Sequence, residues 1–285
     1  MKIFLLIVWV LICPPLYAQS YAITDQPTEL KFPGKFVWID LLTTDIYVAA
    51  KFYKSVFGWQ SSAIGDDYIL LSNNGKRIAG IVKNKHQLED NESNQWISFI
   101  STVDIDKAHL KLVKAGAKAV AGPMTIEGRG DIGVYVAPDS AVFGTINSLM
   151  GDPEEIGAGL NDWVWTELWS TDTRAAAEFY KLLGYDVVDN WKSDNEQDLI
   201  LATGQVARAG LVEGHESQTR SIWLAYILVE SVEDTIVRSE LAGGKTHRLL
   251  GESYSAGKVA LISDPTGGLV ALYEYSGDKG GQASE

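Results

Sequence analysis

The stretch that decides the fold is FVWIDLLTTDIYVAAKFYKSVFGW, residues 36–59, because the chain writes it twice. The second copy is WVWTELWSTDTRAAAEFYKLLGY, residues 163–185, at an offset of about 127 positions. Trp96 and Trp223 share this offset, so the duplication extends beyond the quoted stretch. A repeat of this length predicts two structural units of the same kind.

Each copy begins as a strand and continues as a helix. Residues 36–42 are nearly all apolar, with the aromatic and β-branched content of a strand covered on both faces. Asp45 can cap the following helix, and Gly58 ends it. Strand, helix and further strands follow in this order four times, from residues 36, 95, 163 and 222. The pattern predicts an α+β fold of four βαβββ modules.

Composition shifts divide the chain. Residues 151–161 are rich in Gly, Asp, Pro and Glu, which favours a connection between domains. We predict a signal peptide over 1–18, a linker over 19–35, a first domain over 36–150, a linker over 151–162, a second domain over 163–275 and a frayed tail over 276–285.

The N-terminus has the pattern of a secretory signal. Lys2 precedes about ten apolar residues, too few to span a bilayer, and Ala18 offers a small residue for cleavage. We expect export to the periplasm or the extracellular space, with cleavage after Ala18 or, as second choice, after Ala22. An uncleaved anchor is the alternative. Cys13, the sole cysteine, lies in this segment, so the mature protein has no thiol chemistry.

The charge of the chain restricts its partners. A formal net charge of −13 opposes binding to nucleic acid, whose phosphates require basic patches. After signal cleavage no stretch is apolar enough for a membrane helix. The charge thus excludes nucleic acid but names no partner, and the oligomeric state stays open.

Two copies of one motif carry a family likeness. The pattern Asp-x-x-x-Ala-x-x-Phe-Tyr starts at Asp45 and again at Asp172, and a turn, Asp-Pro-Thr-Gly-Gly, occupies residues 264–268. The chain thus resembles the vicinal oxygen chelate superfamily, which includes glyoxalase I, extradiol dioxygenases and bleomycin-resistance proteins, and more narrowly its tandem glyoxalase-like members. The resemblance covers residues 36–275 and implies two glyoxalase-like domains, each a curled mixed sheet of two modules around a cavity.

In the enzymes of that superfamily, His, Gln or Glu side chains hold a divalent metal in the cavity. The resemblance places the matching positions of this sequence at Trp38, Ile97, Gly144, Trp165, Leu224 and Ala271. None of these residues offers a nitrogen, oxygen or thiolate ligand. We therefore expect no metal and no other cofactor, and a divalent metal enters only if its ligands have moved.

Alternate residues of a strand share a face, so the first strand turns Phe36, Trp38 and Asp40 toward the same cavity. In the second domain the matching face carries Trp163, Trp165, Glu167 and Trp169. Apolar rings disfavour an ionised carboxyl, which makes Asp40 and Glu167 candidate general bases or ligand anchors. Alternatively, each carboxylate hydrogen-bonds to a neighbouring strand or pairs with an arginine such as Arg77 or Arg208.

The tryptophans of these strands also have two interpretations, ligand binding or packing. Trp38, Trp165 and Trp169 can stack on a planar or apolar ligand, or they can fill the cavity themselves. Trp96 and Trp223 fall one residue off the cavity face and are expected in the core.

Three functional hypotheses follow. The first is a metal-free protein that binds a small, partly aromatic or apolar molecule in a module cavity. The second is a lyase, hydrolase or dioxygenase with relocated ligands from Asp40, Glu167 or His247, or with a cavity carboxylate as general base. The third is a structural or interaction protein with filled cavities. Arg129 lies in a turn between two glycines, which is either a plain surface turn or one that closes over a cavity mouth and meets an anionic ligand.

Overall fold

A computed structural model describes residues 21–85, 94–189, 198–214, 219–250 and 257–275. The first sheet has the strand order β2-β3-β4-β1-β5-β8-β7-β6. Its elements are β1 (Phe36–Thr43), α1 (Ile46–Phe57), β2 (Gln60–Ile64), β3 (Tyr68–Asn73), β4 (Lys76–Lys83), β5 (Gln95–Ser101), α2 (Ile105–Lys114), β6 (Lys118–Ile126), β7 (Gly130–Val136) and β8 (Val142–Ser148).

The second sheet repeats this topology as β10-β11-β12-β9-β13-β16-β15-β14. Its elements are β9 (Trp163–Ser170), α3 (Thr173–Tyr180) with a 3₁₀ turn η2 (Lys181–Leu183), β10 (Asp186–Asp189), β11 (Leu199–Thr203), β12 (Val206–Glu213), β13 (Ile222–Leu228), α4 (Val232–Leu241), β14 (Lys245–Leu250), β15 (Gly257–Ser263) and β16 (Leu269–Tyr275).

Each sheet joins two modules through its central strands. β1 runs antiparallel to β5, with Asp40 opposite Ile97, and parallel to β4 of its own module. The second sheet repeats this arrangement with β9, β13 and β12. The predicted α+β fold of paired βαβββ modules with mixed sheets is confirmed. No helix among the described residues is long and apolar enough to cross a membrane.

The repeated motif has a structural reason at each of its positions. The Asp45 side chain accepts hydrogen bonds from two amides in the first turn of α1, and Gly58 ends that helix with φ at 74°. The motif tyrosines, Tyr53 and Tyr180, each accept a hydrogen bond of 2.8 Å from the indole of a tryptophan, Trp96 or Trp223. The motif thus fixes each helix to its sheet.

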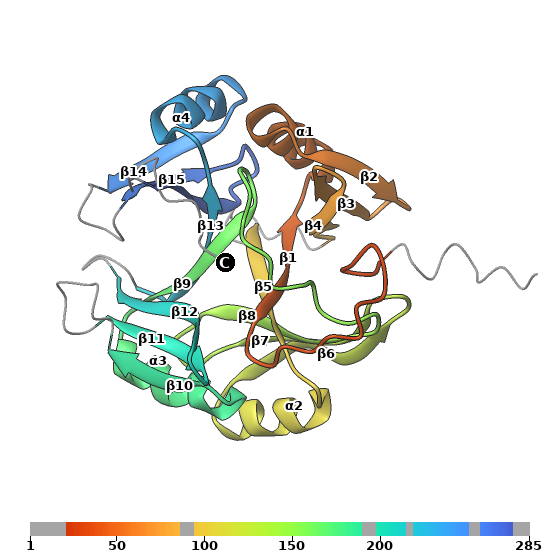
Figure 1. The fold of residues 1–285 in the computed structure, drawn as a ribbon, viewed down its shortest axis with the longest axis vertical. Coiled ribbons are helices and arrows are strands. Elements are labelled where there is room, and N and C mark those ends of the chain that lie inside the picture. The colour runs from red at the N-terminus through yellow and green to blue at the C-terminus, as the bar shows by residue number, and fades with distance from the viewer. Residues whose placement is uncertain (1–20, 86–93, 190–197, 215–218, 251–256, 276–285) are drawn as a thin grey trace, which may run out of the picture.

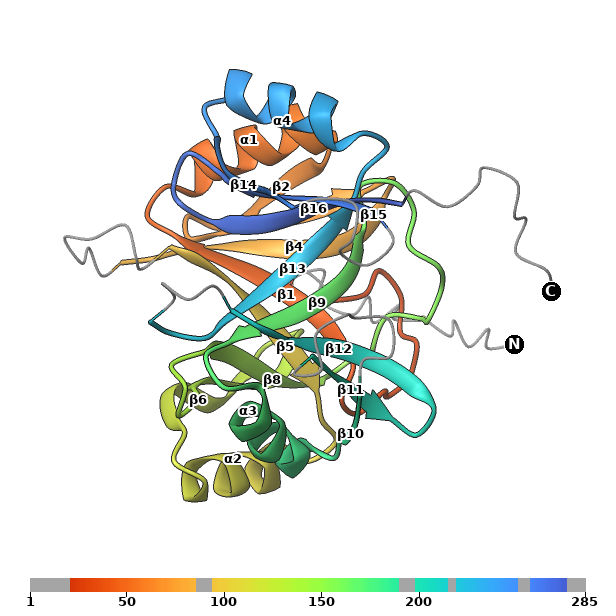
Figure 2. The same ribbon diagram turned by 90° about the vertical axis from the view of Figure 1, so that its left-hand side faces the viewer.

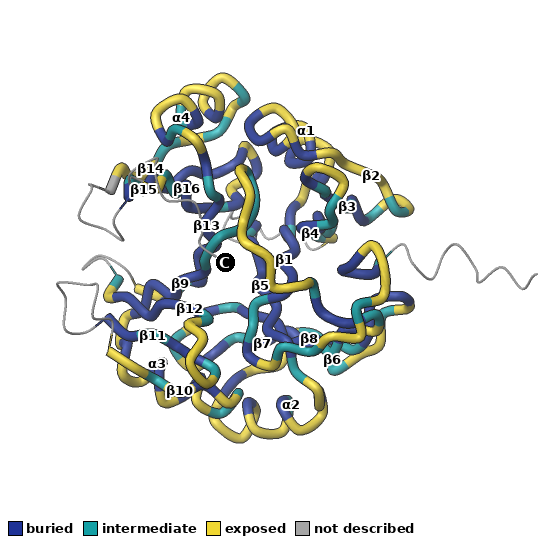
Figure 3. Tube along the Cα trace, viewed as in Figure 1, coloured by how far each residue is buried: buried dark blue, intermediate teal, exposed yellow. Residues whose placement is uncertain are grey.

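The two sheets pack together through the faces that bear helices. Figure 1 shows α1 beside α4 at the top and α2 and α3 at the bottom, and Figure 2 shows the strands crossing between these layers. One core cluster combines Leu41 of β1 with Ile227 of β13 and with buried residues of α1 and α4. The buried strands lie in the middle of the molecule (Figure 3). We call the opposite face of each sheet, which bears no helix, its outer face.

Irregular strand pairing changes the predicted faces of two aromatic residues. The register between β1 and β5 shifts between Phe36 and Trp38, which puts Phe36 on the helix-bearing side, 4.9 Å from the Trp223 ring. A shift opposite β9 likewise turns Trp163 toward Trp59 in the core. The prediction that Phe36 and Trp163 face the cavities is wrong, because a bulge breaks the alternation that the prediction assumed.

Part of the segment before β1, which was predicted as a linker, packs against the first sheet. Ala22 and Ile23 are 1% and 2% exposed, and Ile23 packs in the same cluster as Trp38 on the outer face of the first sheet. Arg77 donates a 2.8 Å hydrogen bond to the Ala22 carbonyl, and Arg129 donates one of 3.1 Å to the Tyr21 carbonyl. The outer face of the first sheet is therefore covered by the chain itself.

Candidate functional site

The outer face of the first sheet holds a buried ion pair. Asp40 receives hydrogen bonds from the Trp38 indole at 2.8 Å, from the Tyr68 hydroxyl at 3.1 Å and from the Arg129 guanidinium at 2.6 Å. Arg129, 3% exposed, also stands over the Trp38 and Tyr68 rings. Burial acts to lower the pKa of Arg129, but Asp40 and Tyr68 outweigh it and hold that pKa above its usual value.

This network bears out the arginine alternative for Asp40, with a different arginine. Arg77 instead pairs with Asp25, and Arg208 with Glu155. Arg129 comes from the turn between β6 and β7 and is buried, so it does not lie on a plain surface turn. The positive charge of Arg129 compensates the negative charge of Asp40. The Tyr21 ring, 5.3 Å from the Tyr68 ring, packs beside this ion pair.

The outer face of the second sheet carries a carboxyl without such a cation. Glu167, 4% exposed, accepts a 3.0 Å hydrogen bond from the Trp165 indole on one oxygen, and the Tyr226 hydroxyl donates to the other. Trp169 donates to the Tyr226 hydroxyl at 3.4 Å. Among the described residues, no lysine or arginine forms an ion pair with Glu167.

Glu167 therefore differs from Asp40 in its electrostatic surroundings. Burial raises the pKa of Glu167, and the hydrogen bonds from the Tyr226 hydroxyl and the Trp165 indole oppose that rise only in part. Beside it, Trp165 and Tyr273 are half-buried and pack against the apolar cluster of this face. The raised pKa favours the neutral carboxyl, and half-buried aromatic rings lie beside it. Such a site can bind the apolar part of a molecule against the rings while the carboxyl forms a hydrogen bond, or exchanges a proton, with a polar atom of that molecule.

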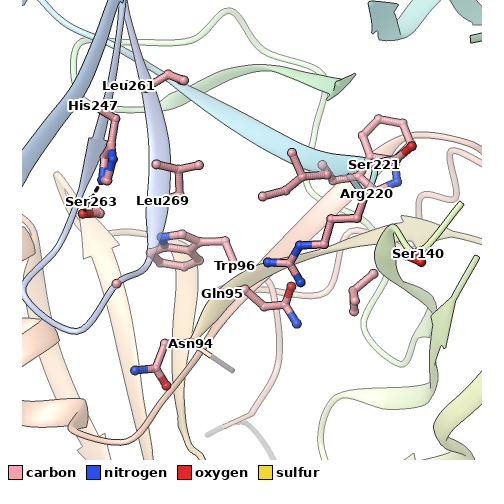
Figure 4. A pocket seen from close by; sticks show the side chains of 14 residues that line it. Asn94, Gln95, Trp96, Ser140, Arg220, Ser221, His247, Leu261, Ser263 and Leu269 are labelled. Atoms are coloured by element: carbon pink, nitrogen blue, oxygen red, sulfur yellow. Dashed lines mark hydrogen bonds between the residues drawn. The ribbon is translucent and has the colours of Figure 1, made fainter. Parts of the chain in front are cut away.

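A cleft of about 740 Å³ lies between the two sheets, apart from both carboxyls. It takes residues from the starts of β5, β8, β13 and β16, together with His247 of β14 and Ser263 of β15 (Figure 4). Trp96 and Trp223 line it although both are buried, as the sequence predicted for core residues. Sequence reasoning singled out His247 but missed the cleft, because strand ends from two separate sheets form it.

His247 is the histidine that the structure brings to this cleft. Its Nε2 lies 2.8 Å from the Ser263 hydroxyl oxygen. Burial and the neighbouring Lys245 lower the pKa of His247, so the ring is neutral at pH 7. Because Asp40 and Glu167 do not line the cleft, His247 forms no common site with either carboxyl.

Comparison with known proteins agrees with the architecture. The family model of the Glyoxalase/Bleomycin resistance protein/Dioxygenase superfamily matches residues 35–138. The first domain belongs to this superfamily. The second domain repeats the topology of the matched domain strand for strand.

Two relatives match most of the chain. CFP32 of Mycobacterium tuberculosis, which bears a provisional glyoxylase name, is 25% identical over 245 residues, covering 82% of this chain and 92% of that protein. The anthracycline biosynthesis protein DnrV of Streptomyces peucetius is 25% identical over 261 residues, covering 85% and 94%.

Solved structures of two enzymes share the fold. Homoprotocatechuate 2,3-dioxygenase of Brevibacterium fuscum, in complex with 3,4-dihydroxyphenylacetate, superposes with a TM-score of 0.60 at 16% identity, over 90% of this chain and 86% of that one. The Mn(II)-bound glyoxalase of Novosphingobium aromaticivorans gives 0.58 at 14% identity, over 86% and 83%. At these identities the likeness concerns the fold alone.

The residues at the six positions matched to the superfamily's metal ligands do not fit a metal ion. Trp38 and Ile97 lie in the outer-face cluster of the first sheet, and Trp165, Leu224 and Ala271 lie in that of the second. Gly144 approaches the Phe99 ring in the first of these clusters. The described residues contain no group of three or more His, Cys, Asp or Glu side chains that could hold a metal ion. The positions that resemblance assigned to ligands thus face the outer sides and carry no donor.

Proposed function

We propose that this protein binds a small, partly aromatic or apolar molecule on the outer face of its second domain, without a metal ion. The observation that carries the proposal is the contrast between the two carboxyls. Asp40 is neutralised by Arg129 and covered by the chain's own residues from Tyr21 onward, whereas Glu167 has no cation among its described partners.

The residues around Glu167 suit such a ligand. The half-buried ring of Trp165 offers a face for stacking, and Glu167 in its neutral form can donate one hydrogen bond to a polar atom of the ligand. One relative, DnrV, is named for the biosynthesis of anthracyclines, which are polycyclic aromatic compounds. An aromatic ligand is consistent with that name.

Binding of 2-naphthol, a neutral planar probe, tests the proposal by equilibrium dialysis. We expect Trp165→Ala to weaken binding about three- to tenfold, the value of one stacking contact. Trp38→Phe is the matched control, since Trp38 is covered by the first domain's own network, and it should leave affinity unchanged. Equal effects of the two substitutions, or none from Trp165→Ala, would refute the proposed site.

The metal-free part of the proposal has its own test. The purified protein should contain much less than one divalent ion per chain by elemental analysis, and excess chelator should not alter 2-naphthol binding. A stoichiometric metal that chelation removes together with binding would overturn it.

A second candidate function is enzymatic, and the raised pKa of Glu167 favours it. In this alternative, a lyase, hydrolase or dioxygenase of the superfamily uses Glu167 as a general base, since a base works best with a pKa near the working pH. Glu167→Gln keeps the shape of the side chain but removes the base. Loss of turnover with retained 2-naphthol binding in that variant would establish the enzyme, and retained turnover would exclude Glu167 as the base.

We also propose that the protein is exported with cleavage after Ala18. Cleavage after Ala22 would remove the carbonyls of Tyr21 and Ala22, which accept hydrogen bonds from Arg129 and Arg77. N-terminal sequencing of the protein recovered from the periplasm or medium should start at Gln19. A start at Ile23, or recovery of the protein in the cytoplasm with Met1 intact, would contradict this.

A further inference from the structure

The two outer faces carry the same pair of side chains in the same arrangement. On the first sheet the Trp38 indole donates a hydrogen bond of 2.8 Å to Asp40, and on the second sheet the Trp165 indole donates one of 3.0 Å to Glu167. The two pairs occupy equivalent positions of β1 and β9, 127 residues apart. The two sites are copies of one another, so the group that one of them holds indicates what the other accepts.

The first site holds a cation that the chain itself supplies. The Arg129 guanidinium forms an ion pair of 2.6 Å with Asp40. The central carbon of the guanidinium also lies 5.5 Å from the centre of the Trp38 ring and 5.1 Å from that of the Tyr68 ring. A planar cation is therefore held by a carboxylate and by aromatic rings at the same time, which combines an ion pair with cation–π contacts.

The second domain has no such cation in the equivalent segment. β7 begins at Gly130 and β15 begins at Gly257, 127 positions later. The residues before these glycines are therefore equivalent, Arg129 in the first domain and Ala256 in the second. The six residues that precede Gly257 lie outside the described part of the chain, and their sequence contains no lysine or arginine. Within the described part, no lysine or arginine forms an ion pair with Glu167.

A second acidic residue acts on Glu167 where the first domain has a hydroxyl donor. Tyr68 and Asp198 each stand two residues before the residue that pairs with the glycine beside the carboxyl, so the two are equivalent. Tyr68 donates to Asp40, whereas the negative charge of Asp198 adds to burial in disfavouring the ionised form of Glu167 and raising its pKa. A cation bound beside Glu167 would favour the ionised carboxylate again.

We propose that the ligand of the second outer face carries a planar cation of the amidinium or guanidinium type, which takes the place that Arg129 fills in the first domain. This inference rests on the proposed function, because it names the chemical class of the ligand at the same site. The cation lies against Glu167 and over the ring of Trp165, which is half-buried. The apolar or aromatic body of the ligand packs against the described cluster of this face, whose residues all come from strands of the second sheet.

Benzamidine and benzamide test this proposal, because they have nearly the same shape and only benzamidine is a cation at pH 7. By isothermal titration calorimetry we expect benzamidine to bind with a Kd of about 1 mM or tighter, and benzamide at least about tenfold more weakly. Glu167→Gln should weaken benzamidine to the level of benzamide and leave benzamide unchanged. Glu230→Gln, an exposed position before α4 with the same loss of charge, is the control and should change neither.

The indole N–H resonances locate the binding and separate this inference from the proposed function. Benzamidine should shift the resonance of Trp165 and leave that of Trp38, whose site already holds Arg129, in place. Equal affinities for benzamidine and benzamide, or equal effects of Glu167→Gln and Glu230→Gln, would overturn the inference. If 2-naphthol shifts Trp165 and benzamidine does not, the inference fails and the proposed function stands. If neither probe shifts Trp165, both fail.

Discussion

Arg129 should be among the most costly residues to replace in the chain, although it lies in a turn. Arg129→Met keeps much of the side-chain volume but leaves the Asp40 carboxylate, 5% exposed, without its cation. It also removes the hydrogen bonds to the Tyr68 hydroxyl and to the Tyr21 carbonyl. Breaking one partner out of a buried pair costs about 3–5 kcal/mol. The unfolding midpoint should fall by roughly 10 °C.

A double substitution distinguishes charge from packing at this site. Equilibrium unfolding in urea should show that Asp40→Leu combined with Arg129→Met is less destabilised than Arg129→Met alone, because no unpaired charge remains buried. The interpretation would be refuted if Arg129→Met lost less than about 1 kcal/mol, the range of an exposed pair. It would also fail if the double variant were the less stable of the two.

Two further predictions concern Glu167 and the glycine beside Asp40, Gly80. Because the folded-state pKa of Glu167 lies above its unfolded value, the stability that this group contributes is present below the unfolded pKa and is lost as pH rises through the folded pKa. The native protein should therefore lose stability relative to the Glu167→Gln variant as pH rises from 4 toward 8. A stability difference between the two proteins that does not change with pH would contradict the raised pKa. Gly80→Ala should cost about 1–3 kcal/mol, since its added carbon would stand 2.0 Å from the Tyr68 hydroxyl and 2.2 Å from Asp40. Gly157→Ala, with open space around it, is the control, and equal urea midpoints for the two variants would show that the first outer face is not tightly packed.

The architecture could be predicted from the sequence because its determinants are local and repeated. Asp45 and Asp172 cap helices and Gly58 terminates one, each through contacts within a few residues. The alternation of residues along a strand correctly predicts that Trp38 and Asp40 share a face of the first sheet. It also predicts correctly that Trp165 and Glu167 share the equivalent face of the second sheet. It failed at Phe36 and Trp163, where bulges interrupt the period of two.

The parts of the site that sequence reasoning missed depend on distant contacts. The partner of Asp40 is Arg129, 89 positions away, and nothing local indicates that pairing over the alternatives Arg77 and Arg208. Residues 21–25 have no periodicity, so their burial follows from tertiary contacts such as that of Ile23 with the Trp38 cluster. The cleft at Trp96 and Trp223 requires the two domains to be placed together before it exists.

Ligand binding to the second outer face is the central claim, and the indole resonances of the protein test it most directly. Titration with 2-naphthol should move the Trp165 resonance progressively while that of Trp38, held between Asp40 and Arg129, stays unchanged. A spectrum in which Trp165 does not respond at saturating 2-naphthol, or in which Trp38 responds instead, would contradict the account.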